Sequence, residues 1–136
     1  MKTLGEIKSH IEKLAGQVQI PSDLMPSFGK FPGHYTYLYL ENNEYHWVTG
    51  GDSQRISDRA TTDIRELTYM VFETLTRQMG LIHEVTHRDR NPALDNRRLA
   101  YRHQLDLLEH LDPAWAITRQ KEIEEELKWY PYKDHQ

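Results

Sequence analysis

A five-residue string in the middle of the chain has the spacing of a zinc-hydrolase motif. It reads His83-Glu84-Val85-Thr86-His87, so two histidines lie four residues apart and a glutamate follows the first. On a helix, residues four apart share a face, and such a pair can hold one zinc ion while the glutamate acts as general base. A zinc-dependent hydrolase that uses His83, Glu84 and His87 is therefore one hypothesis.

Three features of the sequence argue against that hypothesis. The motif is short, and a chain with 8 histidines among 136 residues can contain it by chance. A catalytic zinc needs a third protein ligand, and the candidates Asp106 and Glu109 belong to a segment that is typical of an ordinary amphipathic helix. Pro92 follows His87 closely, so the helix is expected to end nearby. We therefore expect partly exposed histidines, no metal or other cofactor, and a protein that is not an enzyme.

A second candidate for chemistry is a group of arginines that a nucleic acid could contact. It consists of Arg88, Arg90, Arg97, Arg98 and Arg102. Aspartates are interleaved with these arginines, and the whole chain has a net charge of −4 and a pI near 6.0. Because phosphate binding favours a basic face, we expect a solvated or internally paired helix surface and no direct binding of nucleic acid.

The third candidate is a row of tyrosines in a predicted hairpin. Tyr35, Tyr37 and Tyr39 alternate with threonine and leucine, which predicts a strand with the tyrosines on one face. Asn42-Asn43 favours a turn, and the chain returns through Tyr45–Val48, with Trp47 expected near the tyrosines.

Two arrangements of this hairpin stay open from the sequence. Either Leu38 and Leu40 face the core and the tyrosines form an outer surface, or the tyrosines cover the core. An outer aromatic surface suits protein binding, because tyrosine and tryptophan supply contact area at low entropic cost. The expected protein-binding residues are then Tyr37, Tyr39, Glu41, Glu44, Trp47 and Asp52.

The order of the predicted helices and strands that position these residues indicates an α+β fold. Thr3 and Glu6 have capping-box spacing before an apolar stripe, and Pro-rich residues 20–33 read as a loop. Strands follow over about 34–41, 45–48 and 54–60, then helices over about 62–87, 91–111 and 113–129. We expect an N-terminal helix, a small antiparallel β-meander of two or three strands, and three α-helices packed on one face.

Length and composition indicate one domain over residues 1–136. The chain has no cysteine, which excludes a disulfide framework and a thiolate metal site. No secretory signal or membrane-spanning stretch is recognisable, so we expect a cytoplasmic protein without a membrane partner.

Short blocks in the helical half follow one another in an order that is similar to a known family. They are Thr62–Leu67, Tyr69–Phe72, Glu84, Arg88, Asp95–Arg98, Gln104–Leu108, Trp115 and Tyr130–Tyr132. In order and spacing they resemble the immunity protein 63 family of bacterial polymorphic toxin systems. Glu84 and Arg88 fall on family positions, whereas His83 and His87 fall where other residues usually stand.

This resemblance implies an antitoxin that binds and neutralises a cognate toxin domain by protein–protein binding. Toxins of this kind include those of contact-dependent growth inhibition, and many are nucleases. A basic nuclease would suit this acidic chain, because complementary charge speeds and orients association. The resemblance also implies that the zinc-like motif is a coincidence, and it marks no toxin-contacting residues.

Overall fold

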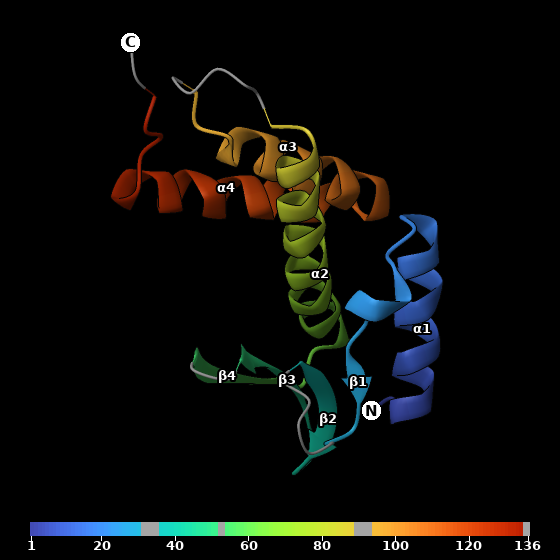
Figure 1. Cartoon of the computed structure of the whole chain (residues 1–136). Coiled ribbons are helices and arrows are strands. Elements are labelled where there is room, and N and C mark those ends of the chain that lie inside the picture. Colours follow the sequence, from blue (N-terminus) through green and yellow to red (C-terminus); the bar gives the residue numbers. More distant parts are fainter. Residues whose placement is uncertain (31–35, 52–53, 89–93, 135–136) are drawn as a thin grey trace. The chain divides into compact units, whose positions relative to one another are not determined.

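The computed structural model describes residues 1–30, 36–51, 54–88 and 94–134, and Figure 1 shows its helices and strands. The chain divides into two compact units, residues 1–71 and 72–136. A four-stranded sheet and four α-helices over the described ranges confirm the α+β class. The expected single domain, and the expected packing of three helices on one face of the sheet, stay predictions.

The first unit begins with helix α1, Leu4–Gln17. The predicted capping box is confirmed, since the Thr3 hydroxyl accepts from the Glu6 amide and the Glu6 carboxylate accepts from the Thr3 amide. Ile7 and Ile11 recur on one face and are fully buried. The cap and the apolar stripe together fix where this helix begins and which side packs inward.

The sheet has the strand order β1-β2-β3-β4. Its strands are β1 (Ser27–Phe28), β2 (Tyr37–Glu41), β3 (Glu44–Gly51) and β4 (Gln54–Thr61). Strands β2, β3 and β4 form the expected antiparallel meander, with an irregularity in the register between Thr49 and Gly51.

Strand β1 corrects one expectation. It pairs in parallel with β2, with Ser27 opposite Tyr37 and Phe28 opposite Leu38, so the sheet is mixed. The sequence predicts a loop here, because a two-residue strand among prolines carries no alternating pattern. Its pairing depends on a partner strand further along the chain.

Helix α2, Ile64–Thr86, starts in the first unit and continues into the second. As predicted, Asp63 caps its start, since a carboxylate oxygen accepts from the Arg65 amide at 2.8 Å. The Glu66 carboxylate instead accepts from the Thr61 hydroxyl. This contact joins the end of β4 to the first turn of α2.

The second unit contains the rest of α2 with α3 (Arg97–Leu111) and α4 (Pro113–Trp129). Asp112 caps α4 and Pro113 opens it, as predicted. Helix α3 starts later than expected. The predicted cap at Asn91-Pro92 lies outside the described residues, and Asp95 accepts from the Arg97 amide at the observed start.

In the second unit, α2 approaches α3 at a glycine and contacts α4 through an aromatic pair. A Cβ added at Gly80 of α2 would lie 2.4 Å from the backbone oxygen of Ala100 in α3, so only glycine permits this approach. Phe72 stacks on Trp115 of α4 with ring centroids 6.0 Å apart.

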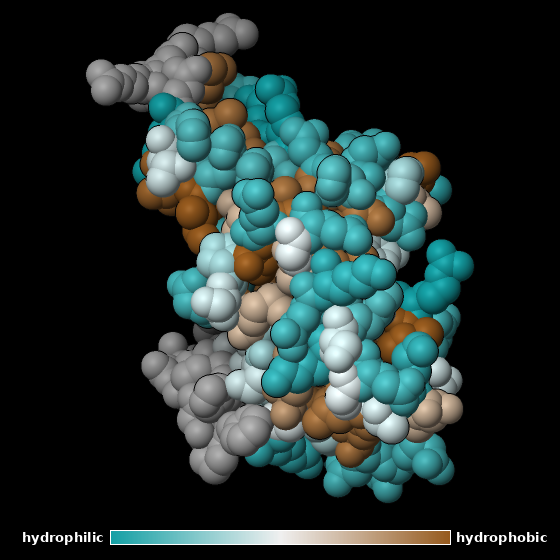
Figure 2. Space-filling view, turned by 90° about the vertical axis from the view of Figure 1, so that its right-hand side faces the viewer, coloured by the Kyte–Doolittle hydropathy of each residue, from teal (hydrophilic) through white to brown (hydrophobic). Residues whose placement is uncertain are grey.

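Within the described ranges, no helix is both long enough and apolar enough to cross a membrane. Figure 2 shows one face of the molecule, on which hydrophilic residues dominate and hydrophobic residues form separate small patches.

Candidate protein-binding site

The turn between β2 and β3 sets the geometry of the candidate site. Asn42 and Asn43 have φ of 54° and 60°, which is the conformation of a two-residue hairpin turn. The turn places Glu41 opposite Glu44 and Tyr39 opposite His46. Side chains directly opposite each other share a face of the sheet. We call this side the tyrosine face and define it by Tyr37, Tyr39, Glu41, Glu44, His46, Val48, Asp58 and Ala60.

Trp47 belongs to the other face, so the expectation that it lies beside the tyrosines was wrong. It pairs with Leu38, and only 2% of its surface is exposed. Leu38 and Tyr45 are buried on the same side. The physical reason is the two-residue turn, whose register puts an odd-numbered β3 residue opposite an even-numbered β2 residue.

The Tyr39 side chain is part of a network of contacts with Asp58 and His46. It is 9% exposed, and its hydroxyl donates to Oδ2 of Asp58 at 2.8 Å. His46 stacks on the Tyr39 ring with centroids 4.5 Å apart, and its Nδ1 lies 2.9 Å from Oδ1 of Asp58. Because both contacts end on one carboxylate, the three side chains fix each other's orientation.

The electrostatics of this network favour an ionised Asp58 and a neutral Tyr39. Burial raises the pKa of Tyr39 to about 12, and the hydrogen bond to Asp58 adds to the effect. Burial alone would raise the pKa of Asp58, but the hydrogen bonds from His46 and Tyr39 outweigh it and the pKa falls. The Asp58 side chain is 43% exposed, so its negative charge is accessible to a partner.

Lys30 completes the tyrosine face from outside the strands. Its ammonium lies 4.3 Å from the centroid of the Tyr39 ring and 3.6 Å from the Glu41 carboxylate. The face therefore presents three carboxylates, those of Glu41, Glu44 and Asp58, against one lysine. Such a surface is suited to contact with cationic side chains.

The structure brings four of the six predicted binding residues together. Tyr37, Tyr39, Glu41 and Glu44 share the tyrosine face, Trp47 is buried on the other, and Asp52 lies outside the described residues. Lys30, His46 and Asp58 were not among the residues predicted from the sequence. The position of His46 could have been predicted, because a two-residue turn at Asn42-Asn43 places it opposite Tyr39.

The zinc-like motif has a different geometry from a metal site. The rings of His83 and His87 stack with centroids 4.1 Å apart and planes 18° apart. A metal bound by imidazole lies in the plane of the ring, and two nearly parallel stacked planes share no such nearby point. Glu84 is engaged by Arg88 at 2.9 Å. Among the described residues, no group of three or more His, Asp or Glu side chains could hold a metal ion.

His83 instead lies between two other imidazoles. Its ring also stacks on His103 of α3, with centroids 4.2 Å apart and planes 1° apart. Burial lowers the pKa of His103, and the neighbouring His83 and His87 act in the same direction, which outweighs the opposite effect of Asp106. The three rings form a stack that joins the end of α2 to α3.

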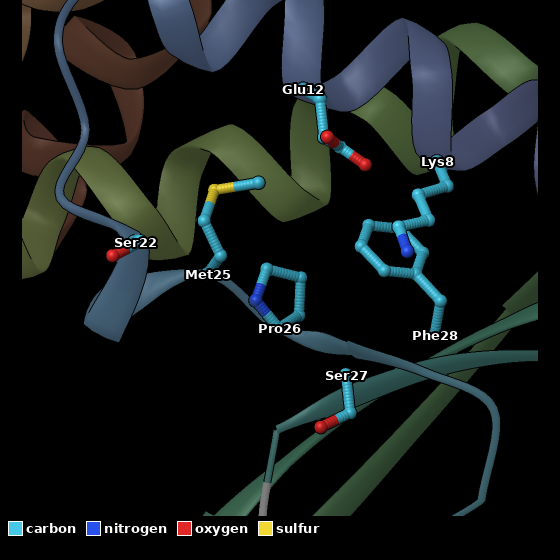
Figure 3. Close-up of a pocket in the computed structure, with 7 residues that line it drawn as sticks. All are labelled: Lys8, Glu12, Ser22, Met25, Pro26, Ser27 and Phe28. Atoms are coloured by element: carbon cyan, nitrogen blue, oxygen red, sulfur yellow. The ribbon is translucent and has the colours of Figure 1, made fainter.

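A cavity of about 550 Å³ lies in the first unit between α1 and the segment that contains β1. In Figure 3, Lys8 and Glu12 reach from α1 toward Pro26 and Phe28, while Ser27 points away. The Lys8 ammonium is 5.9 Å from the centroid of the Phe28 ring. This cavity contains none of the residues predicted to bind a partner.

The described geometry defines an α+β protein whose candidate site is a charged and aromatic sheet face. A family model described as Immunity protein 63 matches residues 41–125. The match covers more than half of the chain, so the chain belongs to the Immunity protein 63 family, as the resemblance indicated. This membership supports an immunity-protein role. No curated protein and no solved structure matches the chain.

The matched segment has a definite relation to the site. It begins at Glu41, includes Glu44, His46 and Asp58 of the tyrosine face, and continues to residue 125 in α4. Tyr37, Tyr39 and the cavity beside α1 precede it.

Proposed function

We propose that this protein is an antitoxin that binds and neutralises a cognate toxin domain by stoichiometric protein–protein binding, without catalysis or a cofactor. Membership of the Immunity protein 63 family supports the role. The observation that carries the binding surface is the tyrosine face, where Glu41, Glu44 and Asp58 surround the ordered pair of Tyr39 and His46.

The proposed partner is a basic toxin domain, such as a nuclease of a contact-dependent growth inhibition or other polymorphic toxin system, met in the bacterial cytoplasm. The net charge of −4 supports this choice, because opposite charge raises the rate of association and disfavours wrong partners. The tyrosine face carries two more carboxylates than ammonium groups when Lys30 is counted against Glu41, Glu44 and Asp58.

The internal contacts of the tyrosine face favour tight binding. Tyr39, His46 and Asp58 already hold one another, so little side-chain entropy is lost when a partner docks. Tyr37, whose ring centroid is 5.9 Å from that of Tyr39, is partly exposed and supplies aromatic contact area.

The test is binding to the toxin domain encoded beside this protein's gene, purified from the co-expressed complex. Isothermal titration is expected to give one toxin domain per chain. The double variant Glu41→Lys/Glu44→Lys is expected to weaken the complex at least about tenfold, because two attractive contacts become repulsive. It is also expected to lose part of the salt dependence of association.

A matched control changes the net charge by the same amount elsewhere. Asp23 and Glu125 are exposed, and Asp23→Lys/Glu125→Lys is expected to bind within about threefold of the wild type. Absence of any complex with the wild-type protein would contradict the proposed function. Equal weakening by both double variants would contradict the tyrosine face as the contact surface.

A further inference from the structure

Helices α3 and α4 pack against each other in the second unit (Figure 1) and leave a groove between them of about 450 Å³. Its apolar floor is formed by Leu105 of α3 and by Ala116 and Ile117 of α4. Asp106, Glu109 and Glu124 line its edges. We call this feature the α3–α4 groove.

Ile117 is the exposed part of this floor, whereas Leu105 is partly exposed and Ala116 is buried. Leu108 of α3 and Ile123 of α4 are buried in the unit. Ile117 directly follows the buried Ala116, so it is rotated by about 100° away from that packed side. As a result 59% of its surface is exposed. A large β-branched residue in this position offers apolar area to a partner.

The carboxylates around the groove differ from the other acids of the same helices. Glu122 and Glu126 pair with Arg119, and Glu125 pairs with Lys128. In the part of the chain that the structure describes, Asp106 and Glu109 have no hydrogen bond and no ion-pair contact within 4 Å. Among the described residues, Glu124 accepts a hydrogen bond from the Gln120 amide, at 3.2 Å. Asp106 acts electrostatically on His103 of the same helix. Within the described residues, none of the three carboxylates is ion-paired with a lysine or arginine.

Lys121 is the single cation on the groove's described lining. Three carboxylates against one ammonium leave the groove anionic, and a cationic partner is the complementary one. A groove between two helices with an apolar floor also has the geometry that receives the apolar face of an amphipathic helix.

We propose that the α3–α4 groove is a second contact surface for the toxin, and that it receives a basic amphipathic helix of the toxin domain. An apolar side chain of that helix covers Ile117 and Leu105, and lysines or arginines on either side pair with Asp106 and Glu109. This inference rests on the proposed antitoxin function. All residues of the groove lie within the segment that matches the family.

The test uses the purified neighbouring toxin domain and two variants that act on different parts of the groove. Asp106→Lys/Glu109→Lys reverses the charged edge, and Ile117→Ser removes the exposed floor. We expect the first to weaken binding at least about tenfold and the second about three- to tenfold, with circular dichroism unchanged. The control is Asp23→Lys/Glu125→Lys, whose acids lie outside the groove.

A fluorescent label gives a second measurement, because the chain has no native cysteine. Gln120→Cys carries the label at the groove, and Asp23→Cys carries it in the first unit. Addition of the toxin domain is expected to shift the emission of the first label and to leave the second unchanged.

The outcomes separate this inference from the function on which it rests. Tight binding of the wild type with no loss in either groove variant would overturn the groove and leave the antitoxin function standing. No binding of the wild type would overturn both. Self-association of the protein alone, abolished by Ile117→Ser, would assign the groove to a second copy of this chain and overturn the proposal.

Discussion

Arg119 and Gln104 form a buried side-chain contact between α4 and α3. Nε of Arg119 donates to Oε1 of Gln104 at 3.0 Å, and the two residues are 3% and 1% exposed. Gln104 in turn donates to the Glu73 backbone oxygen at 3.0 Å and lies 3.3 Å from the Thr76 hydroxyl. Burial lowers the pKa of Arg119, but the carboxylates of Glu126 and its neighbours outweigh it, so the guanidinium stays charged.

The first prediction concerns this contact. Arg119→Met is expected to lower the free energy of unfolding by about 1–3 kcal/mol, because the Gln104 oxygen then stays buried without its donor. Urea denaturation monitored by circular dichroism measures the loss. Arg102→Met, on the exposed side of α3, is the control and is expected to change stability by less than about 0.5 kcal/mol.

A double-mutant cycle tests whether the loss comes from this pair. The double variant Gln104→Leu/Arg119→Met is expected to lose less stability than the sum of the two single variants. Each single variant leaves one partner of the contact buried without the other, whereas the double variant removes both. Simple additivity would show that Arg119 acts through other contacts.

The second prediction concerns the approach of α2 to α3. Gly80→Ala is expected to destabilise the protein by about 1–3 kcal/mol, although alanine favours helix, because its Cβ would meet the Ala100 carbonyl at 2.4 Å. The control is Gly5→Ala in α1, where nothing lies within 4 Å of the added carbon. That change is expected to be stabilising by up to about 1 kcal/mol. Thermal unfolding distinguishes the two, and equal stability of both variants would contradict the close approach.

The third prediction concerns pH. In the folded protein the pKa of His103 is lowered from its ordinary value of 6.5 by burial and by His83 and His87, which together outweigh the opposite effect of Asp106. Below pH 6.5 the unfolded chain therefore binds a proton that the folded protein resists, so stability is complete above that pH and is lost as the pH falls.

The measurement is urea denaturation at pH 7.5 and pH 5.5. The wild type is expected to lose more stability between these values than His103→Gln does. His10→Gln removes an exposed histidine of α1 and is expected to keep the wild-type slope. If His103→Gln lost as much unfolding free energy between pH 7.5 and pH 5.5 as the wild type, the histidine stack would not be the source of the pH dependence.

The fourth prediction concerns the hairpin turn. Asn43 has a φ of 60°, a conformation that costs most side chains about 1–2 kcal/mol. Asn43→Val is therefore expected to destabilise the protein by about 1 kcal/mol or more, whereas Asn43→Gly is expected to preserve it. Because this turn holds Tyr39 opposite His46, the valine variant is also expected to bind the toxin domain more weakly. Thermal unfolding and titration calorimetry measure the two effects.

The local features of the fold were determined by the sequence itself. The capping box at Thr3, the cap and proline at Asp112-Pro113 and the hairpin turn at Asn42-Asn43 are all confirmed. Each depends on hydrogen bonds or backbone preferences between residues a few positions apart, and such interactions can be inferred from adjacent residue types.

Only the tertiary structure decided which residues become neighbours over long distances. The pairing of β1 with β2, the stack of His83 on His103 and the burial of Arg119 against Gln104 leave no periodic signal in the chain. The face on which Trp47 lies was implied by the turn. The turn did not indicate that both faces contain buried residues, Tyr39 and Val48 on one and Leu38 and Trp47 on the other. A strand pattern records that side chains alternate, whereas burial depends on the elements that cover each side, and these come from elsewhere in the chain.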